Sequence, residues 1–194
     1  MASLVLTGDT SGQVTIAAPA VAGTNTLTLQ AATATNAVNT LATAVASTSG
    51  TSINFTGLPS WIKRITVMFQ GVSTNGTADI IFQLGTGSTP TYTTSGYLGT
   101  VSKQDSLSQI FSSSFTLVNG VTATQVWHGN IVICNLTSNV WSEFGILGQS
   151  VTTGQTRMSG GSVSLGAILT AIRITTSNGT DAFDAGTINI LYEG

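Results

Sequence analysis

The sequence predicts an all-β protein in which a segment of short strands, residues 1–50, precedes an antiparallel, jelly-roll-like β-sandwich, residues 51–194. Three observations lead to this fold class. Runs of β-branched and aromatic residues recur along the chain, and Gly-, Asn- and Ser-rich turns separate them. All 13 aromatic residues also lie after residue 50, so only the second part has the material for a large core.

The first 50 residues contain strand-forming pieces but few core residues. The pieces are residues 4–6, 14–16 and 27–29, with turn-forming residues between them. Burying a Val or Leu contributes about 1.5–3 kcal/mol, whereas ordering the backbone of each residue costs about 1–2 kcal/mol. We therefore expect other chains to hold this segment, because it cannot fold as a free monomer.

Residues 31–46 have a pattern that fits two conformations. Their apolar residues are spaced alternately by three and four positions, as in the seam of a coiled coil: Ala31, Ala34, Val38, Leu41 and Val45. Because the intervening threonines are poor helix formers, an extended linker or a short strand is the alternative to a helical bundle. In either form we expect Val38, Leu41 and Val45 to join the chains of an oligomer.

The rest of the chain reads as a series of strands. We expect strands at residues 52–56, 64–69, 80–84, 111–118, 126–136, 141–147, 163–165, 168–176 and 187–192. Asn-Gly pairs at positions 75, 119 and 178 mark turns, and the pair Asn119-Gly120 predicts a hairpin that joins residues 115–118 to residues 121–124. Many short strands with spaced turns indicate an antiparallel sandwich or a jelly roll.

Charged residues are scarce, at 6% of the chain, where a typical soluble domain has about 25%. Five basic residues cannot form the stripe that nucleic acid requires. No run approaches the roughly 18 apolar residues of a membrane span, and the N-terminus lacks a secretory signal. We therefore expect a protein made in the cytoplasm, without membrane insertion, whose neutral surface is covered by copies of itself.

Three stretches of the chain resemble segments of tailed-bacteriophage fibres and other virion structural proteins. They are residues 8–29 (GDTSGQVTIAAPAVAGTNTLTL), 53–67 (INFTGLPSWIKRITV) and 183–193 (FDAGTINILYE). The resemblance implies a homotrimeric, β-rich virion component that is attached by its N-terminal part and displays its C-terminal part outward. Its implied partners are other virion proteins, of the tail or of the capsid.

Three functions therefore stay open. The first is a tail fibre that contacts a host-surface glycan, the second a capsid head fibre or decoration protein, and the third a polysaccharide-cleaving tailspike. For the spike, Asp181 and Asp184 are the neighbouring carboxylates that glycoside hydrolysis would use, although a solvated turn also explains them. His128, the one histidine, lies in an expected strand and fits a structural role. We expect no enzyme, no cofactor and no metal site.

The candidate residues for glycan binding are aromatic. Tyr92 and Tyr97 lie in residues 85–100, an uncharged stretch rich in Gly, Ser and Thr, and loops on a rigid scaffold concentrate binding residues. Trp61 is the third candidate. All three tryptophans lie in or beside expected strands, where a core or subunit-interface role is the alternative.

Overall fold

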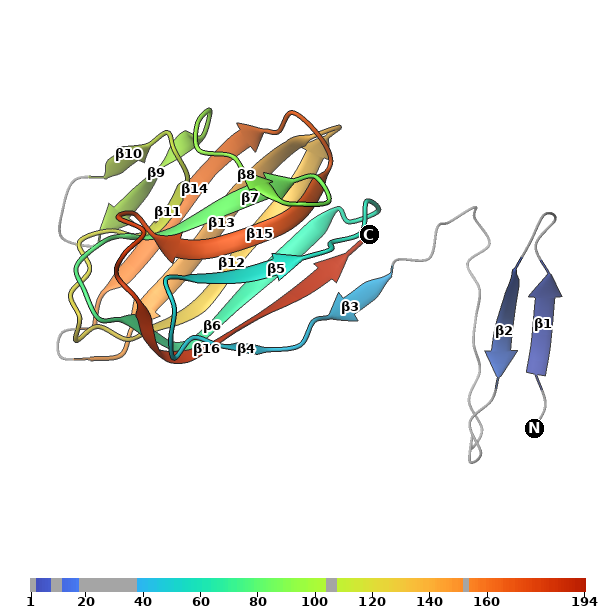
Figure 1. Ribbon diagram of the computed structural model, residues 1–194, viewed down its shortest axis with the longest axis horizontal. Coiled ribbons are helices and arrows are strands. Elements are labelled where there is room, and N and C mark those ends of the chain that lie inside the picture. Colours follow the sequence, from blue (N-terminus) through green and yellow to red (C-terminus); the bar gives the residue numbers. More distant parts are fainter. Residues whose placement is uncertain (1–2, 8–11, 18–37, 104–107, 152–153) are drawn as a thin grey trace. The chain divides into compact units, whose positions relative to one another are not determined.

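The computed structural model describes residues 3–7, 12–17, 38–103, 108–151 and 154–194. They belong to two compact units, Met1–Asn36 and Ala37–Gly194. Every regular element among these residues is a β-strand (Figure 1), which confirms the all-β prediction.

The first unit contains one antiparallel pair of strands. β1 (Ser3–Thr7) pairs with β2 (Gln13–Ala17), so that Leu4 lies opposite Ile16. Strands were predicted at both places, whereas the strand predicted at residues 27–29 lies outside the described residues. The side chains of Val5 and Leu6 are about half exposed, which fits a segment with no core of its own.

The second unit is a jelly roll, because its principal strands pair in nested order. The pairs are β3 (Asn39–Leu41) and β4 (Val45–Ala46) with β16 (Phe183–Glu193), β5 (Ser52–Thr56) with β15 (Leu169–Thr176), β6 (Arg64–Thr74) with β12 (Trp127–Thr137), and β7 (Ile80–Thr86) with β11 (Phe115–Val118). All are antiparallel, and the first strand pairs with the last. This is the connectivity of a long hairpin wound into two sheets.

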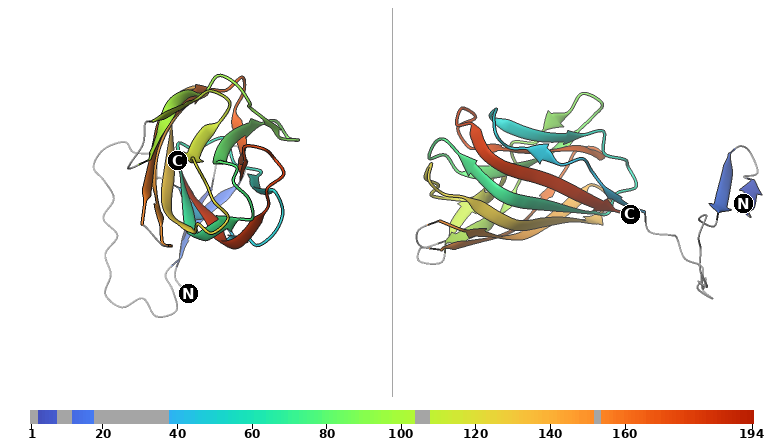
Figure 2. Two further views of the ribbon diagram at one scale, coloured as in Figure 1. Left: turned by 90° about the vertical axis from the view of Figure 1, so that its left-hand side faces the viewer. Right: turned by 90° about the horizontal axis from the view of Figure 1, so that it is seen from below.

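Two insertions add four strands to one sheet and one strand to the other. The first contains β8 (Thr91–Tyr92), β9 (Leu98–Lys103) and β10 (Gln109–Phe111), and the second contains β13 (Val140–Gln149) and β14 (Thr156–Ser164). The larger sheet has nine strands in the order β10-β9-β14-β13-β12-β6-β16-β3, with β4 also on β16. The smaller has five, in the order β11-β7-β15-β5, with β8 on β7. The two sheets lie face to face (Figure 2).

The core lies between these sheets. Side chains alternate between core and surface along the strands, as on β6, where Ile65, Val67 and Phe69 are buried and the residues between them are not. The largest fully buried aromatic side chains are Trp127, Tyr97, Phe82, Phe115 and Phe183. All of them come from the part of the chain that the sequence assigns to the sandwich.

The sandwich begins before residue 51, where the sequence placed its boundary. Val38 and Gly194 exchange two backbone hydrogen bonds, of 3.1 and 3.2 Å. The Ser47 hydroxyl is buried and donates to the carbonyl of Ala185 at 2.8 Å. Residues 37–50 are therefore part of the second unit, because β3 and β4 complete its nine-stranded sheet.

The seam predicted in residues 31–46 is extended wherever the structure describes it. Val38 and Leu41 are 50% and 63% exposed, whereas Val45 packs against the core of its own chain. The strand alternative is thus confirmed for residues 39–41 and 45–46, and residues 31–37 lie outside the described part.

The hairpin predicted at Asn119-Gly120 is wrong. β11 ends at Val118, and residues 121–124 form no strand. Gly120 has a φ of 63°, but among the described non-glycine residues only Ser138 has a positive φ, so Asn119 does not complete a type I′ turn. The N–H of Gly120 instead donates to Asp79 at 3.0 Å, which ties this turn to the β6–β7 loop.

Candidate functional site

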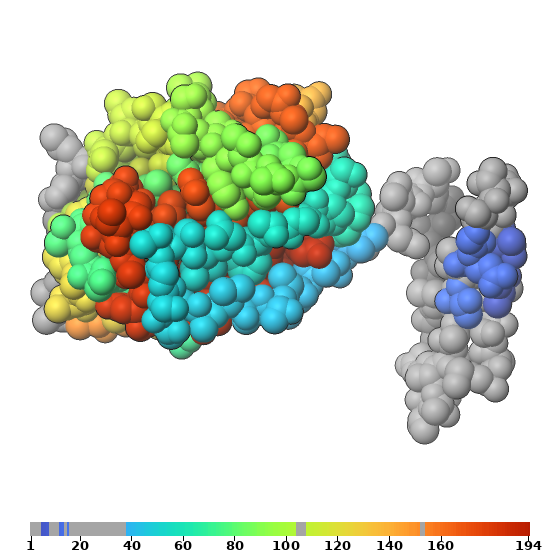
Figure 3. Space-filling model, in the orientation of Figure 1, coloured from blue at the N-terminus to red at the C-terminus, as the bar shows by residue number. Residues whose placement is uncertain are grey.

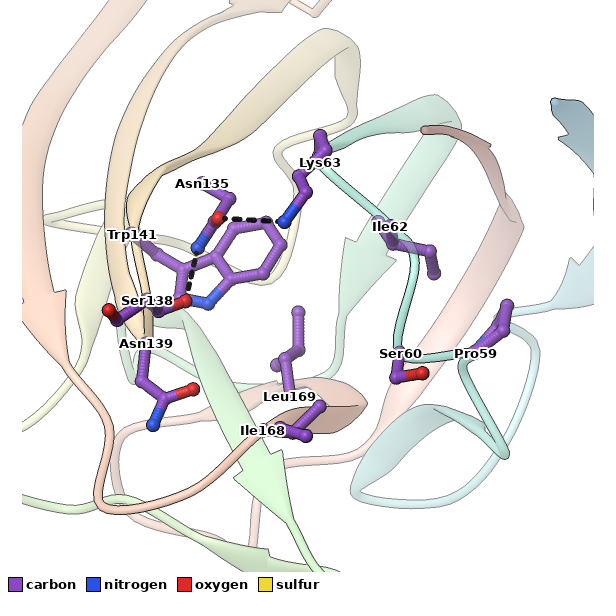
Figure 4. A pocket seen from close by; sticks show the side chains of 10 residues that line it. All are labelled: Pro59, Ser60, Ile62, Lys63, Asn135, Ser138, Asn139, Trp141, Ile168 and Leu169. Carbon is purple, nitrogen blue, oxygen red and sulfur yellow. Dashed lines mark hydrogen bonds between the residues drawn. The ribbon is translucent and has the colours of Figure 1, made fainter. Parts of the chain in front are cut away.

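One hollow, of about 260 Å³, lies at the end of the sandwich that carries Val38 and Gly194. We call this the Val38–Gly194 end. The hollow is bordered by the β5–β6 loop, the β12–β13 turn and the start of β15 (Figure 4). The N–H of Lys63, on its rim, donates to the Glu193 carbonyl at 2.8 Å, which fixes the hollow beside the end of β16.

This end hollow combines an indole with amide and hydroxyl groups. Trp141 is 3% exposed and its ring lies among the lining side chains in Figure 4. The Asn135 amide donates to the Ser138 carbonyl at 2.9 Å and accepts from Lys63 Nζ at 3.4 Å. The arrangement suits a small polar ligand, with the amide of Asn139 at its edge.

Trp61 lies at the same end of the sandwich. Its ring is 5.7 Å from the ring of Tyr192, measured between centroids, and the residue is 38% exposed. It also lies against Gly194, where an added Cβ would come within 2.4 Å of the indole. Trp61 is therefore an exposed aromatic residue at the Val38–Gly194 end. Its ring lies against Tyr192 and Gly194, and no contact among the described residues joins it to Tyr92.

A second arrangement of polar side chains lies on the outer face of the five-stranded sheet, the side of the molecule that Figure 3 shows. The Arg173 guanidinium lies over the Tyr92 ring, with Cζ 4.2 Å from the ring centroid. Arg173 Nε donates to Gln83 Oε1 at 3.0 Å, and Nη2 donates to the same oxygen. The Tyr92 hydroxyl donates to Asn54 Oδ1 at 3.0 Å. We call these four residues the Tyr92–Arg173 ledge.

Strand register explains why these side chains meet. Arg173 lies opposite Asn54 of β5 on one side and opposite Gln83 of β7 on the other. Tyr92 of β8 lies opposite Gly85, where a Cβ would come within 2.9 Å of the tyrosine ring. The absence of a side chain at Gly85 therefore lets the Tyr92 ring lie down beside β7.

Two hollows flank this ledge. One, of about 300 Å³, is lined by Gln83, Arg173, Ile81 and a run of hydroxyl and amide residues: Thr51, Ser52, Thr175, Thr176, Ser177 and Asn178. The other, of about 360 Å³, shares Ile81, Gln83 and Ser177 with the first. The face is thus polar and continuous, and only one large apolar residue is common to both hollows.

The ledge has a cation, Arg173, that pairs with no acidic side chain among the described residues. Among the described residues, the only ion pair joins Arg64 and Glu193, at 3.5 Å. Burial raises the pKa of Tyr92, and the neighbouring Arg173 opposes this change. Arg173 is half-buried, so its charge is held at a fixed place on the sheet.

Tyr97 does not join Tyr92 at the surface. Its side chain is fully buried, its hydroxyl accepts a hydrogen bond from the N–H of Leu84, and its ring packs edge-on against Phe115. Burial raises the pKa of Tyr97 to about 12. Of the predicted receptor-binding residues, Tyr92 belongs to the ledge, Trp61 to the Val38–Gly194 end and Tyr97 to the core.

Sequence reasoning missed Arg173 and Gln83. The signal was present in β15, where Arg173 interrupts a run of apolar residues at an outward position of the alternation Ile172-Arg173-Ile174. A basic residue at such a position marks the surface of a sheet. Nothing in the sequence indicated that Tyr92, eighty residues earlier, would lie under it.

The candidate carboxylates hold turns together. Asp181 accepts hydrogen bonds from the N–H of Ala78 (2.9 Å) and from the Asn178 amide (2.8 Å), and these bonds lower its pKa. Asp184 accepts from the Ser73 hydroxyl instead. Asn178 Oδ1 accepts from the N–H of Asp181 at 3.0 Å, the Asx-type bonding expected of a turn.

His128 has the structural surroundings that the sequence predicted. It lies in β12, its Nδ1 accepts from the N–H of Gly71 at 3.2 Å, and its Nε2 lies 3.2 Å from the Ser150 hydroxyl. The expectation of a hydrogen-bonded histidine in a strand is confirmed.

Two other kinds of site are absent from the described residues. These residues contain no group of three or more His, Cys, Asp and Glu side chains placed to hold a metal ion. Nor do they include a helix with the length and apolar character needed to cross a membrane. No family model, no curated protein and no solved structure matches the chain.

Proposed function

We propose that this chain is a structural protein of a bacteriophage particle: a short trimeric tail fibre, held by its N-terminal segment, that presents the jelly-roll domain to a glycan on the host surface. The resemblance of three sequence stretches to virion proteins supports the proposal, as does a fold that recurs in viral capsid and lectin domains. Because one fold serves many functions, the fold alone does not identify this one. The main structural support for the proposal is the outer face of the nine-stranded sheet.

This face carries exposed apolar side chains on neighbouring strands. Phe144, Ile146 and Met158 are 60%, 51% and 55% exposed, and Ile146 of β13 lies directly opposite Met158 of β14. We call these three residues the sheet-face patch. Leu98 of β9 and Ile110 of β10 are exposed nearby on the same sheet. Contiguous apolar patches of this kind are typical of protein–protein interfaces.

The patch is also free of charge. The two charged residues in β13 and β14, Glu143 and Arg157, are buried and occupy the alternate, inward positions. A neutral apolar face repels no like charge on a second copy, and oligomers of identical chains repeat one interface by symmetry. Burying the patch against sister chains therefore explains both the exposed apolar residues and the low charge of the chain.

The oligomer is tested by size-exclusion chromatography with light scattering on the full chain. We expect a mass near three times the 19.8 kDa of one chain. A Phe144→Ser, Ile146→Ser double variant should shift the mass toward the monomer. Its matched control is Ile168→Ser, which removes an equally exposed apolar side chain at the end hollow. A monomeric wild type would overturn the proposal.

The position in the particle needs a separate test. Antibodies against the domain, visualised with gold on intact particles, should label the tail. Label on the capsid facets would replace the tail fibre with the alternative, a head fibre or decoration protein. Release of oligosaccharides from host envelopes by the purified chain would instead favour the polysaccharide-cleaving spike.

A further inference from the structure

We propose that the Tyr92–Arg173 ledge binds the carboxylate of an acidic saccharide. The inference deepens the proposed function and rests on it for the exposure of this face on the particle. Arg173 recognises the carboxylate, and the hollow beside it accepts the sugar hydroxyls.

The Arg173 guanidinium is held in place by Tyr92 and Gln83 before any ligand binds. It lies on the Tyr92 ring, and Nε and Nη2 both donate to one oxygen of Gln83. Gln83 is itself 5% exposed, and Tyr92 is held by Asn54. The edge formed by Nη1 and Nη2 is left, and no described residue accepts hydrogen bonds from both of its nitrogens. It is one of the two-donor edges of a guanidinium to which a carboxylate binds through parallel hydrogen bonds.

In the described part of the chain, no acidic side chain forms an ion pair with this edge of Arg173. Within the described ranges the only ion pair is that of Arg64 with Glu193. The nearest acidic residue along the adjoining hollow is Asp79, whose carboxylate accepts from the N–H of Gly120. A half-buried cation with no acidic partner favours an anionic ligand.

The rest of the saccharide would lie in the hollow beside Arg173. The hollow next to Arg173 is lined by the hydroxyls of Thr51, Ser52 and Thr175 and by the amide of Gln83, with Ile81 as its one large apolar residue. Hydroxyl and amide groups match the hydroxyls of a sugar ring. A lining that is mostly polar disfavours an apolar peptide side chain, and we take a saccharide as the ligand.

The hollow lies toward the end of the domain away from Val38 and Gly194. It lies where β15 ends and β5 begins, and Thr175 is opposite Ser52 there. β6 leads from the Val38–Gly194 end, where Arg64 pairs with Glu193, to the other end, where Thr74 pairs with Phe183. The turn Ser177–Gly179 at the rim lies at this second end, since the N–H of Ser177 donates to the Asp79 carbonyl. The hollow is therefore remote from the point where the chain enters the sandwich.

The test compares trigalacturonate with its methyl ester, in which each carboxylate is replaced by an uncharged ester, by isothermal titration with the full wild-type chain. We expect the acid to bind about tenfold or more tightly than the ester, because charge-assisted hydrogen bonds are about twice as strong as neutral ones. Raising the salt concentration should weaken binding of the acid only. Equal affinity for the two would overturn the inference, and no variant is needed for this result.

Variants then place the site. Arg173→Gln should lower the affinity for the acid to that for the ester, and Arg173→Lys, which keeps the charge without the planar fork, should give an intermediate value. Lys63→Gln is the matched control, since it removes a cation from the end hollow. Loss of binding with Lys63→Gln and not with Arg173→Gln would assign the ligand to that hollow and overturn the inference. Near-ultraviolet circular dichroism checks that each variant is folded.

Two more measurements separate the remaining outcomes. Inorganic phosphate or an acidic peptide that displaces trigalacturonate at equal concentration would overturn the assignment to a saccharide. Light scattering on the same samples reports the oligomer independently. A trimer with no preference for the acid rejects this inference alone, whereas a monomer that prefers the acid rejects the proposed trimer alone.

Discussion

The buried hydroxyl of Tyr97 accepts a hydrogen bond from the backbone N–H of Leu84, at 2.9 Å. β11 pairs with β7 only from Ile80 to Phe82, so the ladder on that side of β7 has ended before Leu84. The carbonyl of Leu84 points to the same side and accepts from the N–H of Thr93 at 2.9 Å. Tyr97 thus completes the hydrogen bonding of a core strand beyond the end of its neighbour.

Tyr97→Phe should therefore destabilise the domain without changing its surface. The variant leaves the N–H of Leu84 buried and unpaired, at a cost of about 1–3 kcal/mol in the free energy of unfolding. Urea denaturation measures the difference. Tyr92→Phe is the control, because it loses only the exposed hydrogen bond to Asn54, and we expect a loss below about 1 kcal/mol. Equal losses would argue against the role given to Tyr97.

Glu143 makes stability depend on pH. This buried carboxyl accepts from the Ser159 hydroxyl at 2.6 Å, and its second oxygen has no partner in the described part of the chain. Burial raises the pKa of Glu143 from 4.5 to about 7, and the bond from Ser159 opposes the rise. The folded state thus keeps a proton that the unfolded chain releases near pH 4.5. The contribution is complete below that pH and is lost as the pH rises to about 7.

Glu143→Gln removes this titration. The free energy of unfolding of the wild type, relative to the variant, should fall between pH 4.5 and 7 by an amount of the order of 3 kcal/mol and stay constant above pH 7. Denaturation at pH 5 and at pH 8 measures this. A difference that does not change with pH would show that the carboxyl is ionised or solvated throughout.

Truncation distinguishes the two possible starts of the sandwich. A chain lacking residues 1–36 keeps β3 and β4 and should retain the melting temperature of the second unit. A chain lacking residues 1–50 loses both strands and the buried Ser47 hydroxyl, which exposes one edge of β16. We expect this longer truncation to melt at a lower temperature and to aggregate. Equal melting temperatures would restore the boundary at residue 50.

Gly186 lies at a bulge where only glycine fits. Its φ is 94°, and an added Cβ would come within 2.4 Å of the Gly71 carbonyl oxygen. Gly186→Ala should therefore lower the free energy of unfolding by more than about 2 kcal/mol. Gly166→Ala is the matched control, since no atom lies within 4 Å of a Cβ there. A Gly186 variant as stable as this control would contradict the geometry.

The sequence predicted the sandwich better than its edges, for physical reasons. Strands with a buried face repeat their apolar residues, and β5 was predicted to the residue. Residues 156–162 of β14, rich in Ser and Gly, were missed because they include few apolar side chains. Asn119-Gly120 has the composition of a hairpin turn, but the bond from Gly120 to Asp79 decides its conformation, and that contact is far away in sequence.

In the candidate site, too, local sequence patterns predicted some residues, and long-range strand pairing determined the others. Tyr92 was found because its neighbours have loop composition. The partners Arg173 and Gln83 come from strands that only the jelly-roll pairing brings together, and no local pattern contains this information. Tyr97 lies in the same stretch of chain, yet its hydroxyl accepts from the N–H of Leu84 in β7 and its ring enters the core.

The nested pairing also determines how the domain carries mechanical load. Val38 and Gly194 are bonded to each other, and β3 continues from Val38 along β16. A pull on residue 37 directed away from the domain acts along β3, so it shears the hydrogen bonds between β3 and β16 together and does not break them one at a time. If the ledge holds a fixed ligand while the N-terminal segment is anchored, this short pair of strands is the place where the tension enters the fold.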